Sequence, residues 1–352
     1  MTLPPSHEDI IELALPDGAL LPSEDTDVYT SKLGGRPVLF VQPPKDLLDS
    51  LKCPLCNTEL YLLLQMDCPR EEYRGVDRIV YVFACNTRAC SQDARGWRVI
   101  FMIKHKDEEE ENKAQDSKGK ASFWDSLMND EVEDNKNPLS GASSAKSSVS
   151  KSSNNLPIPL SNPKNKFPGI YLHIDEEIIV EKREKKSTVT EIPENVSIAP
   201  EAAGGDEEWS GEQYEKFRAP GTDKSFNRFQ KRVAHYPRQC VRYAVSGAQT
   251  PLLYHDLDLN SVVNKLGSCQ LCNHPTHRFE LQLMPAVLAF LPTESPEYIK
   301  HIAEGKRSTN PMISDGMEWG SVMVYSCGAL CGLANKETEI VEGKVIIQLE
   351  LQ

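Results

Sequence analysis

Apolar residues gather in short runs along the first third of the chain. The runs read VLFV at 38–41, LYLLLQM at 60–66, RIVYVFA at 78–84 and WRVIFMI at 97–103. Each has the length of a β-strand, and Gly, Pro and Cys residues separate one run from the next. The runs are continuous rather than alternating, so we expect strands that are buried on both faces. With one more strand around Ile10–Leu15, they predict an N-terminal β domain over residues 1–105.

The pattern changes between residues 106 and 166, where acidic, Ser, Asn and Lys residues dominate. This stretch contains DEEEEN and GASSAKSSVSKSSNN. Such a composition buries too little apolar surface to offset the entropy of ordering, so it predicts a disordered acidic and Ser-rich linker. Within it, FWDSLM at 123–128 is a short apolar patch. It is either a docking helix or plain linker.

Residues 167–352 form the predicted C-terminal domain. It opens with a strand in FPGIYLHIDEEIIVE, passes through a loose segment at about 184–208 and reaches TDKSFNRFQKRV at 222–233. The last stretch predicts an amphipathic helix capped by Thr222, with Phe226, Phe229 and Val233 on one face.

The net charge of the chain indicates which class of macromolecule it binds. The formal net charge of −13 disfavours general nucleic-acid binding and suits a basic protein partner. The first 31 residues hold seven acids, among them Glu24, Asp25 and Asp27, and no Lys or Arg. That segment is either a solvated lead-in or a dock for a basic partner. Residues 216–242 show the opposite bias, eight basic residues against one acid, which is either a solvated helix face or a nucleic-acid contact.

No run approaches the ~20 apolar residues of a membrane span, and the N-terminus lacks the basic start and apolar core of a signal peptide. We therefore expect a cytoplasmic protein, with the nucleus as a second location. Thiols stay reduced there, so the ten cysteines indicate metal binding or catalysis rather than disulfides.

Eight of the cysteines fall into four close pairs, two in each half of the chain. They are Cys53/Cys56 and Cys85/Cys90, then Cys269/Cys272 and Cys327/Cys331. A CxxC turn brings two thiolates to one point, and a second pair from a neighbouring hairpin completes a tetrahedral site. We predict two structural zinc ions, each held by four cysteines.

The residues around these pairs are related between the two halves. CPLCNTELYLLLQM at 53–66 resembles CQLCNHPTHRFELQLM at 269–284, and RIVYVFACNTRAC at 78–90 resembles GSVMVYSCGALC at 320–331. We infer a degenerate internal repeat of two zinc-ribbon-like β units. The expected fold class is mainly β with a few helices (α+β). The spacing of the cysteines does not show whether the two units pack together.

Roles other than structural zinc binding agree less well with the sequence around these cysteines. A thioredoxin-like redox pair needs a βαβ context, and a catalytic zinc keeps an open position that four cysteines close. Plain buried cysteines remain an alternative. His274 and His277 could each replace a cysteine ligand, although packing or exposure suits His277 better. Cys68 and Cys240 have no close partner and are interpreted as buried thiols.

Sequence motifs for catalysis are missing. The chain contains no P-loop, dinucleotide-binding, HExxH or GxSxG motif. We therefore expect a binding protein rather than an enzyme. An enzyme acting through an unrecognised site is the alternative.

The chain resembles the programmed cell death protein 2 family and, within it, the fungal-type ribosome-biogenesis branch. The resemblance is carried by SKLGGRP at 31–37, both cysteine units, the FPGIYLHIDEEI strand, FNRFQKRVAHYPRQCVRY at 226–243 and EWGSVMVYSCGALC at 318–331. It covers both ends of the chain and excludes the linker. Longer animal relatives carry an additional MYND zinc finger where this chain has its linker, so no partner of that finger is implied.

The resemblance implies a dedicated chaperone of a small-subunit ribosomal protein, the eukaryotic member of the universal S-five family. Such a chaperone captures the nascent basic client and supports small-subunit assembly and pre-rRNA maturation. An acidic protein suits the role, because it masks the client's charge until rRNA replaces it. We expect a monomer that uses Glu24, Asp25 and Asp27 in client binding. The alternative is a zinc-ribbon protein that binds pre-rRNA directly.

Overall fold

The structure of the chain is a computed structural model. It describes residues 10–73, 75–106, 156–157, 166–178, 223–245, 249–304, 315–332 and 338–350. Within these residues, eleven strands form one antiparallel sheet and two more form a small second sheet. The protein is mainly β with a few helices, as the apolar runs predict.

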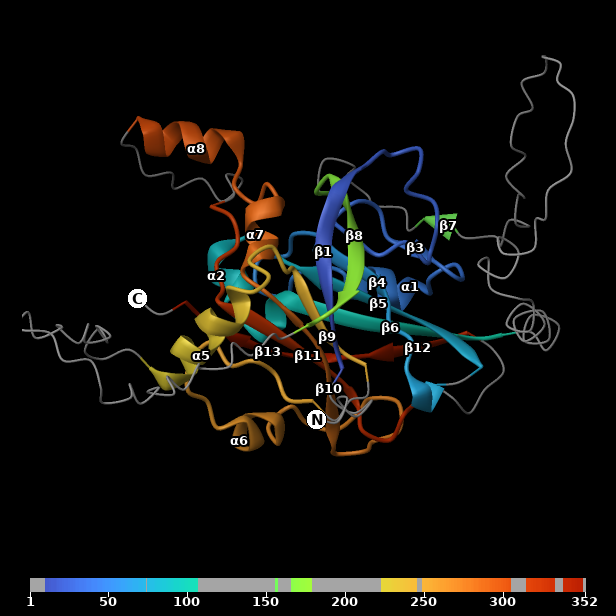
Figure 1. Cartoon of the computed structure of the whole chain (residues 1–352). Coiled ribbons are helices and arrows are strands. Elements are labelled where there is room, and N and C mark those ends of the chain that lie inside the picture. The colour runs from blue at the N-terminus through green and yellow to red at the C-terminus, as the bar shows by residue number, and fades with distance from the viewer. Residues whose placement is uncertain are drawn as a thin grey trace, which may run out of the picture.

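The large sheet takes strands from both halves of the chain (Figure 1). Its order is β12-β6-β5-β4-β2-β8-β1-β9-β10-β11-β13, and β3 pairs with β7 separately. The bounds are β1 Ile11–Leu20, β2 Lys32–Leu33, β3 Val38–Leu39, β4 Tyr61–Asp67, β5 Val76–Ala84, β6 Trp97–His105, β7 Leu156–Pro157, β8 Gly169–Glu176, β9 Val241–Ala244, β10 His277–Leu283, β11 Ser321–Cys327, β12 Glu339–Glu342 and β13 Lys344–Gln348.

The described helices are short. They are α1 Lys45–Ser50, α2 Arg88–Ser91, α5 Lys224–Val233, α6 Leu259–Val263, α7 Ala286–Phe290 and α8 Pro296–Ala303, with single 3-10 turns at Glu71–Tyr73 and Ala94–Gly96. None of them is long and apolar enough to cross a membrane.

The predicted amphipathic helix is α5, but its cap differs from the prediction. The carboxylate of Asp223 accepts a hydrogen bond from the backbone N–H of Ser225 at 2.9 Å, so Asp223 is the N-cap. Thr222 lies outside the described residues. Phe226 and Phe229 pack edge-on against the ring of Tyr254, with centroids 5.1 and 4.9 Å away.

One predicted strand is shorter in the structure, and two predicted segments lie mostly outside the described residues. The VLFV run forms a strand only at Val38–Leu39, where it pairs with β7. The predicted linker and the loose segment at 184–208 lie outside the described residues, except for residues 106, 156–157 and 166.

The sheet curls back on itself through one continuous segment of the chain. Strand β12 pairs with β6 at one edge, and β13, which follows after Gly343, pairs with β11 at the other edge. The backbone N–H of Gly343 donates to Val99 O at 2.9 Å. A Cβ on Gly343 would lie 2.7 Å from Val99 Cγ1 and 2.9 Å from Phe101 Cε2, so only glycine fits this crossing without displacing its neighbours. The sheet is therefore a nearly closed barrel.

The barrel has one shared interior and two separate outer layers. The interior draws on both halves, and the rings of Trp97 and Trp319 meet edge to face there at 6.0 Å. Outside, α1 covers the first half through Leu47 and Leu51. The α6 segment covers the second half. Strand β5 is therefore buried on both faces, as its continuous apolar run predicts.

A charged cluster lies inside this apolar interior. Glu280 on β10 is fully buried, and Arg70 and Arg78 of the first half contact its carboxylate at 3.0 and 2.7 Å. The hydroxyl of Ser326 also donates to Glu280. The guanidinium of Arg78 stacks on Phe101 and Tyr73, 4.3 and 4.7 Å from the ring centroids. The cluster therefore joins the two halves across the barrel.

We expect Glu280→Gln to lower the free energy of unfolding by about 3–5 kcal/mol, because it leaves two buried guanidinium groups without their anion. Urea denaturation followed by tryptophan fluorescence measures this change. The control is Glu72→Gln, since Glu72 forms a partly exposed ion pair with Arg278 at 2.6 Å, and its substitution should cost about 0–1 kcal/mol. Equal effects of the two substitutions would contradict the structural role of Glu280.

Candidate metal centres

The two CxLCN knuckles have the same local geometry. Asn57 and Asn273, each directly after the second cysteine, have left-handed backbone angles of φ 61° and 57°, which Asn tolerates better than most residues. Their backbone N–H groups donate to Cys53 O and Cys269 O at 2.8 and 2.9 Å. This turn aims both thiols of a knuckle at the same side, toward the end of the following hairpin.

Each knuckle meets its second cysteine pair. The four sulfurs of Cys53, Cys56, Cys85 and Cys90 lie within 4.8 Å of one another, and so do those of Cys269, Cys272, Cys327 and Cys331. The structure therefore brings together the eight predicted cysteines in the two predicted sets. His274 and His277 belong to neither group. The side chain of His274 contacts Thr276, and His277 Nε2 lies 2.6 Å from Gly267 O.

The sulfur spacing fits a tetrahedral metal site. The S···S distances are 3.5 Å for Cys56–Cys85, 3.7 Å for Cys269–Cys331 and 3.5 Å for Cys272–Cys327. Metal–sulfur bonds of about 2.3 Å place the sulfurs of a tetrahedron about 3.8 Å apart, whereas a disulfide needs about 2.05 Å. All eight cysteines are free thiols. The donor sets therefore suit a thiophilic ion such as zinc.

In each set the pKa of one thiol is lowered, whereas the pKa of two of its neighbours is raised. Burial opposes the ionisation of Cys56, but hydrogen bonds from Thr58 outweigh it and lower the pKa of the Cys56 thiol to about 7. In the second set, hydrogen bonds from Cys331 and the backbone of His274 lower the pKa of Cys272 to about 7. Burial raises the pKa of Cys85 to about 11. Four adjacent thiolates repel one another, so full ionisation of either set requires a cation at its centre.

Each cysteine set lies against the other half of the chain. Beside Cys90, Arg88 binds Glu318 at 2.8 Å, and Asn86 Nδ2 donates to Thr293 O at 2.7 Å. Beside the second set, the hydroxyl of Tyr73 donates to Cys331 O at 3.4 Å. A metal in either set therefore braces a contact between the halves as well as its own hairpin.

Cys68 and Cys240 are buried in the barrel interior, as the sequence predicts. Burial raises the pKa of both thiols to about 12. Both thiols therefore stay protonated at neutral pH, which is unsuited to metal binding.

The three predicted partner-binding acids do not share one environment. Glu24 and Asp27 are exposed. Asp25 is buried, where it pairs with Lys32 and accepts a 2.5 Å hydrogen bond from the backbone N–H of Arg36. Asp25 is therefore a structural residue, because its removal would leave a buried ammonium group without its anion.

The sequence did not single out Thr58 or Glu280. Thr58 Oγ1 lies 3.0 Å from Cys56 Sγ and 3.6 Å from Cys85 Sγ. Glu280 occupies the bulge in β10 that corresponds to Leu63 in β4. When the two repeats are aligned so that these bulge positions match, Glu280 stands where the first repeat has Leu63. A charged residue at a position that is apolar in the other repeat is the sequence signal that could have identified Glu280.

Comparisons with known proteins match the chain in two separate stretches. The family model for the N-terminal domain of programmed cell death protein 2 matches residues 20–116, and that for its C-terminal domain matches residues 223–349. The probable 20S rRNA accumulation protein 4 of Schizosaccharomyces pombe is 26% identical, over 81% of this chain and 89% of its own length. The human programmed cell death protein 2-like protein is also 26% identical, over 90% and 89%. No solved structure matches the chain.

We expect the purified protein to contain two zinc ions per chain, one for each four-cysteine set. Cys53→Ser and Cys272→Ser should each remove one ion and reduce soluble yield, because structural zinc is coupled to folding. Elemental analysis by mass spectrometry measures the metal. Cys240→Ala is the control, since it removes a thiol outside both sets. An intact metal content in both Ser variants, or iron in place of zinc, would contradict the assignment.

Proposed function

The chain belongs to the programmed cell death protein 2 family, and from this premise we propose that it is a ribosome-biogenesis factor acting as a dedicated chaperone. Its client is a newly made, basic small-subunit ribosomal protein of the universal S-five family. The name of the Schizosaccharomyces pombe relative supports the link to ribosome maturation. The proposed site of action is the cytoplasm, with the nucleus as a second location.

The observation that carries the proposal is an acidic face formed by Glu12, Asp67, Asp77 and Glu176. Glu12 and Glu176 lie directly opposite each other on β1 and β8. Burial, then the nearby Asp77, raises the pKa of Asp67 to about 6, and burial followed by Glu176 raises the pKa of Glu12. Lys106 pairs with Asp77 at 3.2 Å. Crowded carboxylates of this kind favour the approach of a strongly basic protein.

The metal sites support a binding role rather than a catalytic one. Four thiols per ion close a tetrahedral shell, whereas catalytic zinc keeps a position for water or substrate. We propose that the two ions are zinc and that they hold the cysteine loops against the opposite half of the barrel.

Direct RNA binding receives less support from the basic segment at 216–242. Arg232 and Arg242 of that segment both bind Glu177, at 2.7 and 2.6 Å. The Glu177 carboxylate offsets one of these two positive charges, and the side chain of Arg242 is buried, so this pair presents less positive charge to a phosphate backbone than the composition of the segment implies.

We expect Glu24→Gln combined with Asp27→Asn to slow client association several-fold and to leave zinc content unchanged, because both acids are exposed and opposite charges speed encounter. Stopped-flow mixing with the purified ribosomal protein at two salt concentrations measures the rate. The same charge change at Asp46 and Asp49, exposed on α1, is the control. Absence of any complex with the ribosomal protein, together with salt-dependent binding to naked rRNA, would favour the RNA-binding alternative.

The acidic face also predicts a pH effect on stability. The raised pKa of Asp67 means that the folded chain holds this proton more tightly than the unfolded chain. The stabilising contribution is therefore present below about pH 4 and is lost as the pH rises through about 6. Asp67→Asn should raise the free energy of unfolding by about 1 kcal/mol at pH 7.5, after allowance for solvent screening, and by less at pH 4.5. Urea titrations at both pH values measure this, with Asp49→Asn as the control. An equal gain at both pH values would show that Asp67 is not the titrating group.

A further inference from the structure

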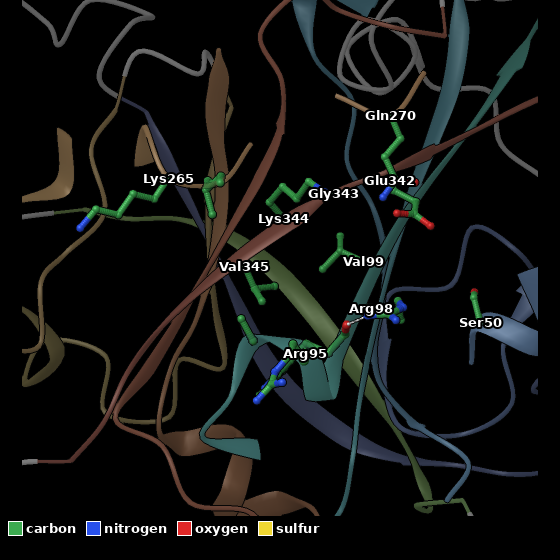
Figure 2. A pocket seen from close by; sticks show the side chains of 13 residues that line it. Ser50, Arg95, Arg98, Val99, Lys265, Gln270, Glu342, Gly343, Lys344 and Val345 are labelled. Carbon is green, nitrogen blue, oxygen red and sulfur yellow. Dashed lines mark hydrogen bonds between the residues drawn. The ribbon is translucent and has the colours of Figure 1, made fainter. Parts of the chain in front are cut away.

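The two outer layers of the barrel leave a hollow between them where the sheet closes. Its floor is formed by the start of β6 and by the Gly343 crossing between β12 and β13. Ser50 of α1 lines one side, and Lys265 after α6 lines the other, as Figure 2 shows. The volume is about 440 Å³ and the hollow is open to solvent. This space accommodates a few residues of a polypeptide rather than a single ion.

The lining is basic although the protein is acidic. It contains Arg95, Arg98, Lys265 and Lys344, against one acid, Glu342. Arg95 is neutralised by Asp93 at 2.6 Å. Within the described part of the chain, Arg98, Lys265 and Lys344 form no ion pair, and Arg98 Nη1 donates only to Trp97 O at 2.8 Å. Three cations thus line the hollow without an anionic partner among the described residues, and the amine of Lys265 is directed away from Arg98 and Lys344 (Figure 2).

We propose that this hollow binds an acidic, extended polypeptide segment of a partner protein other than the basic client. Arg98 offers a planar guanidinium that matches a carboxylate in two-point hydrogen bonding, and Lys265 and Lys344 add two mobile point charges. Gln270 adds an uncharged hydrogen-bonding group at the wall. The site lies at the closure of the barrel and is built from side chains of both halves.

A single-stranded RNA fits the hollow less well. Such sites combine cations with exposed aromatic faces on which bases stack. The aromatic residue in this lining is Trp97, which is only 2% exposed. Its ring contacts Trp319 and its Nε1 donates to Ser91 O at 2.9 Å, so it offers no stacking face. Carboxylates are therefore favoured over nucleotides as the ligand groups.

The test is fluorescence anisotropy with the full chain and a fluorescein-labelled Glu-rich decapeptide. We expect salt-sensitive binding that weakens about tenfold when Arg98→Glu is combined with Lys344→Glu, because two exposed ion pairs are lost. The control combines Lys231→Glu and Lys300→Glu, which make the same charge change at exposed positions on α5 and α8. Metal content and the urea midpoint verify that all variants are folded.

Four outcomes would overturn the proposal. The first three are no binding of the decapeptide to the unmodified protein, equal weakening in the control pair, and tighter binding of a decauridylate RNA with the same dependence on Arg98 and Lys344. A marked gain in decapeptide affinity after deletion of residues 107–155 would identify the chain's own acidic segment as the occupant and would also overturn it. Because no ribosomal protein is used, these outcomes are independent of the chaperone proposal.

Discussion

The buried carboxylate of Glu280 is the interaction on which the arrangement of the two halves depends. It is fully buried and meets Arg70 and Arg78 from the opposite half, more than two hundred residues away along the chain. An ion inside an apolar interior tolerates few geometries, because any misalignment leaves a charge without its partner. Apolar side chains could fill the same barrel in more than one register. The cluster therefore selects one register of the two halves, and the hydrophobic residues stabilise it.

The two halves of the chain are joined by an exchange of their first strands. Strand β1 of the first half pairs with β9 of the second, and β8 of the second half pairs with β2 of the first. Matching positions carry matching ion pairs. Lys32 lies opposite Gln65 and binds Asp25, whereas Arg242 lies opposite Gln282 and binds Glu177. The cysteine sets brace contacts between the halves, so metal binding, strand exchange and the Glu280 cluster act on one structural unit rather than on two independent domains.

The surface of this unit has an acidic face and a separate basic hollow, which the negative net charge of the chain does not reveal. The carboxylates of Glu12, Asp67, Asp77 and Glu176 crowd one face, and the unpaired cations Arg98, Lys265 and Lys344 surround the closure of the barrel. The proposed basic client and the proposed acidic partner segment are therefore assigned to separate surfaces. Exposed ion pairs contribute little affinity individually, so the two surfaces govern encounter and selection more than the final strength of binding.

The local sequence determined the strands and the cysteine sets, because both depend on spacing over a few residues. Continuous apolar runs specify strands buried on both faces, and the CxLCN turn fixes its two thiols wherever the hairpin lies. Burial of Asp25 could not be foreseen, since its partner Lys32 lies on β2, which takes its place in the sheet by pairing with the distant strands β4 and β8. The cationic hollow likewise is lined by Arg98, Lys265 and Lys344, which come from distant segments of the chain and border one hollow where Gly343 closes the sheet. Contacts between distant segments carry no local signature, so the tertiary structure alone decided which charges are buried, which are paired and which remain available for a partner.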